Sequence, residues 1–298
     1  MKKYSLLITF IFALLVYTAI DLHAQQTSLD QTPPIEKLAL KLSKHQLSNI
    51  GLKIYRNETG AKKENLIAWN QGEDFASLGI GHFIWFPKDL NSRFTETFPD
   101  LLDFFIKNDV EMPLWLRTTR DLPWGTKEAF KAARRGDKMQ SLEKLLLSTF
   151  NHQIEFIYER MQAALPKMLA PALLEELGIQ GMEEGIEARF NSLLQSEQGL
   201  YALIDYVNFK GEGIAASERY EGMGWGLLQV LVNMEVEGEK EGLDEAQHNI
   251  ANELKAFSDA CKKVLSRRVA NSTQPEVEQR WLPGWKKRCD TYKVNAKQ

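Results

Sequence analysis

The chain has 298 residues, of which 37 are Lys or Arg and 40 are Asp or Glu, so its formal net charge at pH 7 is −3. A slightly acidic protein has no electrostatic attraction for nucleic acid, and we expect no nucleic-acid partner. The hydrophobic fraction of 44% and the charged fraction of 26% are those of an ordinary globular protein. The five histidines and two cysteines show no spacing typical of metal ligands, so we expect neither a metal site nor a cofactor.

The first residues, 1–24, are typical of a secretory signal peptide. Lys2-Lys3 gives a positive start, Leu6 to Ala19 is an apolar run, and Leu22-His23-Ala24 ends in a small residue. The run has about fourteen residues, fewer than the roughly twenty that a membrane-spanning helix needs. We therefore predict cleavage after Ala24 and a periplasmic or secreted protein without stable membrane insertion. An uncleaved N-terminal anchor is the alternative. Residues 25–34 are polar, end in Pro-Pro and predict a flexible leader.

The remaining residues, 35–298, predict a single domain that is mostly helical. Apolar residues recur every three or four positions from Leu142 to Leu165, which predicts one long helix that ends at Pro166. A second stripe runs from Leu243 to Val264 and predicts a helix that starts near Gly242, with a basic end at Arg267-Arg268. Shorter helices are predicted at 35–47, 98–108, 125–135, 183–196, 198–207 and 224–234.

Only residues 64–86 have the pattern of β-strands. Leu66–Trp69 and Leu78–Phe86 are apolar runs, and they are separated by a polar turn at Gln71–Asp74. The predicted fold class is therefore mostly α with one small β-hairpin.

Glu58 is the first candidate for chemistry. It follows the apolar residues Ile50, Leu52 and Ile54, and Gly60 would let the chain turn sharply after it. Cleavage of a glycosidic bond needs a carboxylic acid that protonates the leaving oxygen, and apolar surroundings favour the protonated form of such an acid. By itself, however, a Glu at the end of a helix is usually an exposed surface residue.

The segments around this residue resemble a known family. Asn57-Glu58-Thr59-Gly60, a hairpin and Ser77-Leu78-Gly79-Ile80-Gly81-His82 are similar to the phage-type lysozymes (muramidases) of the lysozyme superfamily, which have Asp/Glu-Glu-Gly followed by a hairpin that ends in Thr-Ile-Gly-x-Gly-His. The resemblance implies that Glu58 is the general acid and that Ser77 helps to hold the attacking water. It implies that His82 and the two glycines are structural parts of the hairpin, and we also count His82 among the substrate-binding candidates.

The resemblance covers about thirty residues directly and implies a two-lobed lysozyme-like fold. A cleft lobe would span about 35–90, a helical lobe about 91–298, and the hairpin would line the cleft. The hairpin of this chain carries an insertion of about four residues, and Gln71 stands where the family has an aspartate. Glu73 and Asp74 lie close by and could activate water instead, with Asp74 preferred. Both could equally be acidic turn residues.

A second segment lies far downstream. Gly224-Trp225-Gly226-Leu227-Leu228-Gln229 is similar to the Gly-Leu-Met-Gln segment of goose-type lysozymes and soluble lytic transglycosylases, which lines the sugar cleft. Trp225 and Tyr220 offer flat faces to sugar rings, and Gln229 offers an amide. The alternative is a glycine-rich loop that leads into a buried helix, with Trp225 in the core.

The residues between these two segments are further candidates. Asn208 and Lys210 could contact acetamido or peptide groups, although a solvated loop would explain them too. Glu212 is a substrate-binding candidate, and it is also a possible acid, together with Glu218 and Glu221.

The C-terminal part contains Trp281 and a Gly-Trp-x-x-Arg element at Gly284–Arg288. A similar element closes many phage-type lysozymes, which implies a packing role for Trp281 and Trp285; direct stacking on sugars is the alternative. Cys261 and Cys289 could form a disulfide in an oxidising compartment or remain two buried thiols.

The sequence thus predicts an exported, monomeric glycosidase that cleaves β-1,4 bonds between amino sugars of peptidoglycan. Two alternatives remain open. A lytic transglycosylase would use the single acid and leave a 1,6-anhydro sugar. A non-catalytic glycan-binding protein of the cell envelope would keep the lysozyme-like fold without the second carboxylate.

Overall fold

The computed structural model describes residues 43–92, 94–235 and 250–293. The predicted signal peptide, the leader and the predicted helix start near Gly242 lie outside the described residues. None of the helices in the described ranges combines the length and the apolar character that crossing a bilayer requires. From Ser43 onward the chain forms one compact unit.

The prediction of a mostly α-helical protein with little β-structure is confirmed, while the two-lobed arrangement stays a prediction. The α-helices of the described residues are α2 (Lys44–Thr59), α3 (Phe98–Lys107), α4 (Leu114–Arg117), α5 (Lys127–Ala132), α6 (Asp137–Ser148), α7 (Phe150–Met168), α8 (Pro171–Leu177), α9 (Glu183–Leu193), α10 (Glu197–Lys210), α11 (Leu227–Val232), α12 (Ile250–Ala270), α13 (Pro275–Gln279) and α14 (Leu282–Asp290). The strands are β1 (Ile67–Ala68), β2 (Ala76–Leu78), β3 (Phe83–Trp85), β4 (Arg219–Tyr220) and β5 (Met223–Gly224), and short 3-10 turns lie at η1 (Lys63–Leu66), η2 (Ala133–Arg135) and η3 (Ala216–Glu218).

Helix α2 carries Glu58 in its last turn. Ser43 caps its start, because the Ser43 side chain accepts from the Gln46 amide while the Gln46 side chain reaches back to the Ser43 backbone. Its end is set by Gly60, which adopts a left-handed conformation with φ of 65°. The predicted end of the 35–47 helix is wrong, because α2 continues to Thr59, twelve positions beyond 47; residues 35–42 lie outside the described residues.

The three-stranded sheet is antiparallel in the order β1-β2-β3, with Ile67 opposite Leu78 and Ser77 opposite Ile84. The pairing of β1 with β2 is the predicted hairpin. The prediction of one continuous strand over Leu78–Phe86 is wrong, because the chain reverses at residues 79–82. Gly79 and His82 both have positive φ, of 73° and 49°, which a strand cannot accommodate.

The predicted long helix over 142–165 is in fact two helices, α6 and α7, separated at Thr149. The Thr149 hydroxyl donates to the Leu145 carbonyl, and the side chain of Gln153 bonds both Thr149 and the Leu146 carbonyl, so the break leaves these polar groups satisfied. Helix α7 also runs past Pro166 to Met168, since the Leu165 carbonyl still accepts from Leu169. Periodicity alone could not show this break, because the apolar stripe continues across it.

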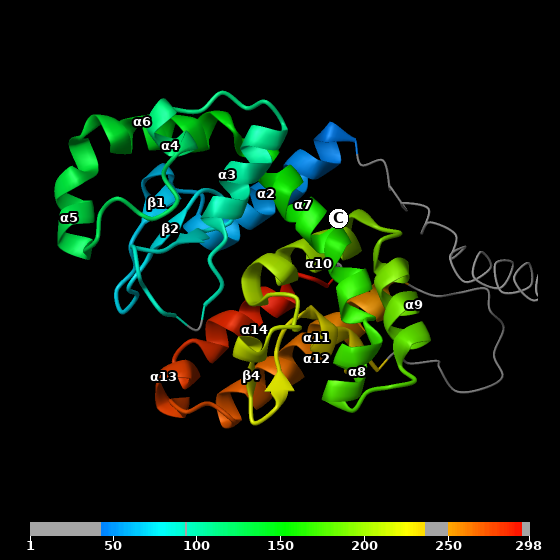
Figure 1. Cartoon of the computed structure of the whole chain (residues 1–298). Helices are drawn as coiled ribbons and strands as arrows, with labels where there is room; N and C mark the ends of the chain where they lie inside the picture. The colour runs from blue at the N-terminus through cyan, green and yellow to red at the C-terminus, as the bar shows by residue number, and fades with distance from the viewer. Residues whose placement is uncertain (1–42, 93, 236–249, 294–298) are drawn as a thin grey trace, which may run out of the picture. The chain divides into compact units, whose positions relative to one another are not determined.

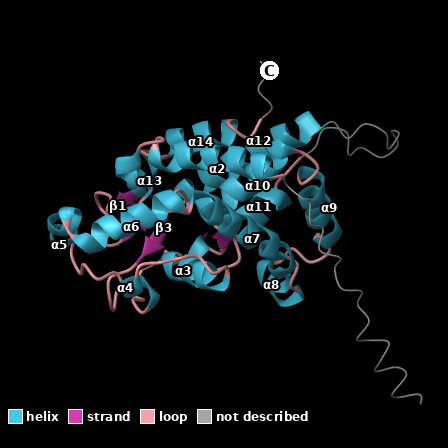
Figure 2. Ribbon diagram, turned by 90° about the horizontal axis from the view of Figure 1, so that it is seen from above, coloured by secondary structure: helices cyan, strands magenta, loops and turns pink. Residues whose placement is uncertain are grey.

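Helix α10 is the centre of the packing, and nearly every residue from Gly199 to Val207 is buried. It contacts α2, α7, α9, α11 and α12, and Figure 1 shows it surrounded by other helices. Figures 1 and 2 both place the three-stranded sheet on the side of α4, α5 and α6, with α8 and α9 on the opposite side. A helix that is apolar all round has to be enclosed in this way.

Three C-terminal helices close the fold. Helix α12 packs against α14, and the Cys261–Cys289 disulfide joins the two, with a Cα–Cα distance of 6.0 Å. The helix predicted at 224–234 is shorter than expected, because β4 and β5 form a small hairpin and α11 starts only at Leu227. The short helices α4, α8, α13 and α14 were not predicted.

Candidate active site

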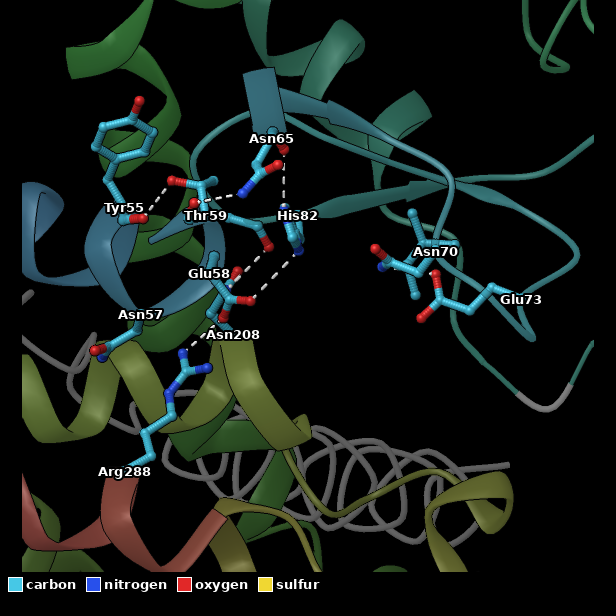
Figure 3. Close-up of polar contacts among 12 residues, drawn as sticks. Tyr55, Asn57, Glu58, Thr59, Asn65, Asn70, Glu73, His82, Asn208 and Arg288 are labelled. Carbon is cyan, nitrogen blue, oxygen red and sulfur yellow. Dashed lines mark hydrogen bonds and ion pairs between the residues drawn. The ribbon is translucent and has the colours of Figure 1, made fainter. Parts of the chain in front are cut away.

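Glu58 lies at the junction of four segments that are distant in sequence. Its Oε1 accepts hydrogen bonds from Arg288 Nη2 (2.6 Å) on α14 and from Asn208 Nδ2 (3.2 Å) on α10. Its Oε2 faces His82 Nδ1 at 3.8 Å in the turn between β2 and β3. Figure 3 shows these side chains converging on the carboxylate, whose side chain retains 13% exposure to solvent. The chain therefore holds a partly accessible carboxyl group in a defined orientation.

Arg288 is held by a second carboxylate. Its Nε and Nη2 donate to Asp205 Oδ2 and Oδ1, both at 2.8 Å, and Asp205 is fully buried. Burial alone would lower the pKa of the Arg288 guanidinium, but Asp205 and Glu58 outweigh it and hold that pKa well above its usual value. The Tyr292 hydroxyl also donates to Asp205 (2.6 Å). This network fixes the guanidinium that in turn fixes Glu58.

The glycine turn between β2 and β3 is positioned against the same carboxylate. Asn208 Nδ2 donates to the Gly81 carbonyl (3.1 Å) as well as to Glu58. A Cβ at Gly81 would lie 2.9 Å from Asn208 Oδ1 and 2.8 Å from the Phe83 ring, so only glycine allows this approach. On the other side, Gln153 Oε1 accepts from the Ile80 amide (2.9 Å). The turn is therefore held between α7 and α10.

His82 has one ring nitrogen committed to the backbone. Nε2 lies 3.2 Å from the Asn65 carbonyl oxygen. A carbonyl can only accept, so Nε2 carries the hydrogen in this contact. Nδ1 then faces Glu58 Oε2. Because Glu58 Oε1 already accepts from Arg288 and Asn208, Oε2 is the oxygen on which a transferable proton would reside.

The candidates for a second carboxylate lie apart from Glu58. Figure 3 shows Glu73 and Asn70 separated from the Glu58 group, beyond His82. Glu73 accepts from Asn70 Nδ2 (3.0 Å), and burial raises the pKa of Glu73, opposed by Asn70, His82, Lys127 and Ser77. Asp74, the preferred residue of the two, is exposed, and Ser77 is buried in β2.

The downstream candidates form a tightly packed loop. Trp225 is only 5% exposed and packs against Tyr220, with ring centroids 4.6 Å apart. The side-chain amide of Gln229 is engaged in hydrogen bonds within the loop. Its Nε2 donates to the Gly213 carbonyl and its Oε1 accepts from the Gly226 amide, both at 3.0 Å. Both contacts favour the packing alternative that the sequence left open for this segment.

The acidic residues of this loop have partners of their own. Glu212 pairs with Lys167 (2.9 Å). Glu218 Oε2 accepts from the Gly213 amide (2.7 Å), and burial raises the pKa of Glu218. Glu221 is exposed in the turn between β4 and β5, where it has a positive φ of 51°.

The sequence did not single out Asp205, Gln153 or the role of Arg288. A signal for Asp205 exists, because it is a lone charge in an otherwise apolar run from Leu200 to Val207. A charge in a helix that is buried all round must be paired. Nothing in the sequence, however, identifies its partner 83 residues away.

No group of three or more His, Cys, Asp and Glu suited to a metal ion occurs in the ranges 43–92, 94–235 and 250–293. Two surface recesses lie away from Glu58, one of about 260 Å³ between Asn233 and α12 and one of about 440 Å³ beside α6. The candidate active site is therefore assigned from the side chains that converge on Glu58. Neither of the two recesses contributes to the assignment. Comparison of the chain with models of protein families, with curated proteins and with solved structures gave no match.

Proposed function

We propose that the protein cleaves β-1,4 bonds between amino sugars of peptidoglycan, with Glu58 as the general acid. The observation that carries the proposal is the arrangement of the carboxyl group, whose Oε1 is engaged by Arg288 and Asn208 while Oε2 stays available. In its acid form, Glu58 would donate the Oε2 proton to the glycosidic oxygen as the bond to the anomeric carbon breaks. His82 Nδ1, next to Oε2, would orient that proton.

Hydrolysis further requires a group that activates water on the opposite face of the sugar. Glu73 is better supported in this role than Asp74, because it lies within electrostatic range of His82 and of Ser77. Figure 3 shows Glu73 apart from Glu58, and enzymes that invert the anomeric configuration need separated carboxyl groups so that a water can enter between them.

Lytic transglycosylation is the second candidate, and it is favoured by the groups that contact Glu58, which are Arg288, Asn208 and His82 and include no second carboxylate. In that reaction the C6 hydroxyl of the sugar itself attacks the anomeric carbon and gives its proton to Glu58, which became deprotonated when it protonated the leaving oxygen. Glu58 would therefore act without a second carboxylate. The product would carry a 1,6-anhydro end, and no water would be consumed.

The test is the release of soluble fragments from purified peptidoglycan by the full chain and by Glu58→Gln. We expect the substitution to lower the rate by about 10²- to 10⁴-fold, the usual contribution of a general acid. The matched control is Glu64→Gln, which alters an exposed carboxylate six positions further along the chain and should retain full activity. A wild-type protein that binds peptidoglycan and releases nothing would instead support the non-catalytic glycan-binding alternative.

Analysis of the fragment ends separates the two reactions. Reducing ends together with a comparable loss of activity in Glu73→Gln would identify hydrolysis with Glu73 as the base. Anhydro ends with full activity in Glu73→Gln and Asp74→Asn would identify transglycosylation.

A further inference from the structure

Lys210, the last residue of α10, has an amino group that no acceptor in the described residues pairs with. Its Nζ lies 3.7 Å from the centroid of the Trp285 ring and 4.1 Å from that of the Phe209 ring. No hydrogen bond or ion pair of this ammonium group occurs within the described ranges, and the residue is half-buried. Lys210 lies within electrostatic range of the proposed acid, because Glu58 is among the charges that act on the pKa of its amino group.

Two further cations share the same rings. The Arg288 guanidinium lies 4.1 Å from the Phe209 ring centroid, and that of Arg268 lies 5.0 Å from the Trp285 ring centroid. Burial, and then the charges of Arg268 and Arg288, lower the pKa of Lys210 well below its usual value. The aromatic faces attract the ammonium group but provide no hydrogen-bond acceptor.

The carboxylates nearby are already committed to the arginines. Arg268 donates from Nε and Nη2 to Glu278 (3.0 and 3.1 Å). Arg288 is shared between Asp205 and Glu58.

When ionised, Glu58, Asp205 and Glu278 balance Arg268, Arg288 and a protonated Lys210, whose charged form burial disfavours. A general acid must carry its proton, however, and a protonated Glu58 leaves the group with one net positive charge. Of the three basic residues, Lys210 is the one that makes no hydrogen bond or ion pair within the described residues.

We propose that Lys210 and the face of Trp285 form a subsite for a carboxylate of the substrate glycan, next to the bond that is cleaved. This inference rests on the proposed function and narrows its substrate class, because it requires a glycan that carries carboxylates. In peptidoglycan the carboxylate would come from the lactyl group of the muramic acid or from the peptide attached to it. The ammonium group gains the acceptor that it lacks, and the adjacent indole supports the apolar side of the ligand.

The experiment measures binding in the Glu58→Gln background, in which turnover is suppressed. Three ligands of equal sugar length are compared: an N-acetylglucosamine oligomer without carboxylates, an oligomer with alternating muramic acid, and the same oligomer with its peptides. We expect the carboxylate-bearing ligands to bind at least about 10-fold more tightly than the neutral one, the effect of one charge-assisted hydrogen bond. Tighter binding of the peptide-free muramic oligomer identifies the lactyl group, and a gain only with peptides identifies the stem.

Adding Lys210→Met should abolish this preference while leaving the affinity for the neutral oligomer unchanged. Lys210→Arg should keep part of it. The matched control is Lys167→Met, which removes a half-exposed lysine paired with Glu212 and should keep the preference. Amidation of the ligand carboxylates tests the same contact without altering the protein, so the result does not depend on how well the variant folds.

The subsite would be overturned if the double variant bound all three ligands as tightly as the Glu58→Gln protein does. It would also be overturned if Lys210→Met reduced the affinity for all three ligands by the same factor. The proposed function fails separately. If the wild-type chain releases no fragments while the Lys210-dependent preference persists, the subsite belongs to a binding protein. If cleavage is found and the preference is not, only the subsite is wrong. If the Glu58→Gln protein binds none of the three ligands, the subsite is overturned.

Discussion

Buried and partly buried carboxyl groups in this protein are stabilised in two different ways. Glu58 and Glu278 are each paired with an arginine. Glu218 instead accepts backbone N–H groups from the loop that contains Gly213, with Glu212 as a nearby like charge. Because burial is the dominant influence on Glu218 and raises its pKa, the folded protein binds a proton at this residue more tightly than the unfolded chain does.

The first prediction concerns Glu218→Gln and the pH dependence of stability. With the pKa raised in the folded state, Glu218 favours folding most below its ordinary pKa of 4.5. That contribution is lost as the pH rises through the folded-state pKa. The variant should therefore gain stability relative to the wild type across this interval, as measured by denaturant unfolding at a series of pH values. Glu221→Gln, which alters an exposed residue, should follow the wild-type profile. Parallel curves for Glu218→Gln and the wild type would contradict the assignment.

At the scale of elements, local sequence patterns predicted much of the fold. The errors of that prediction have identifiable causes. The hairpin of β1 and β2 followed from two apolar runs around a polar turn. The reversal at residues 79–82 did not, because Gly79 and His82 adopt positive φ in response to contacts with α7 and α10 that are distant in sequence. The break at Thr149 was not predicted either. The helical backbone is interrupted there between α6 and α7, while the stripe of apolar side chains continues across the break.

Gln153 links both of these features and is the subject of the second prediction. Its Oε1 accepts from the Ile80 amide and its Nε2 donates to Leu146 and Thr149, all within the buried interior. Gln153→Met keeps the volume but removes the partner of the Ile80 amide and of the Leu146 carbonyl, at roughly 1–3 kcal/mol for each unsatisfied group, while the Thr149 hydroxyl keeps its bond to Leu145. We expect the free energy of unfolding to fall by about 2–6 kcal/mol in a denaturant titration.

The exposed Gln140 on α6 provides the control for this substitution. Gln140→Met should change the free energy of unfolding by less than about 0.5 kcal/mol. Equal stabilities of the two variants would show that Gln153 does not support the turn. If the turn shifts as expected, Gln153→Met should also lower the proposed activity, since His82 would move relative to Glu58.

At the scale of the whole molecule, α14 is attached to distant parts of the chain in two ways. One is a disulfide bond and the other is an ion-pair network. The Cys261–Cys289 disulfide closes a loop whose ends are 28 positions apart. Arg288, the neighbouring residue, contacts Asp205 and Glu58. The sequence identified Glu58, Asn208 and His82 as candidates, and the structure brings the three together. Their common link to Arg288 could not be predicted, because no local pattern relates an arginine to two carboxylates so far from it.

The third prediction concerns this disulfide. Replacement of Cys261 and Cys289 together by Ser removes the constraint on the unfolded chain, which for a loop of this length is worth about 3 kcal/mol. We expect a loss of that order in the free energy of unfolding, and a decrease of about 6–12 °C in the melting temperature of a protein of this size. Reduction of the wild type with dithiothreitol should reproduce the loss and should not affect the double variant. A variant as stable as the oxidised wild type would show that the cross-link is dispensable.

The contact between Glu58 and Arg288 joins residues 230 positions apart, and this separation has a consequence in time. A chain is synthesised from its N-terminal end, so Glu58 emerges long before the helix that orients it. Until α14 has been made and has packed in place, the carboxyl group of Glu58 lacks its guanidinium partner. Of its two hydrogen-bond donors, Asn208 and Arg288, only Asn208 is then present. The proposed activity would therefore begin only when α14 has been made and has packed against α10 and α2, so that partly made copies of the protein would be inactive.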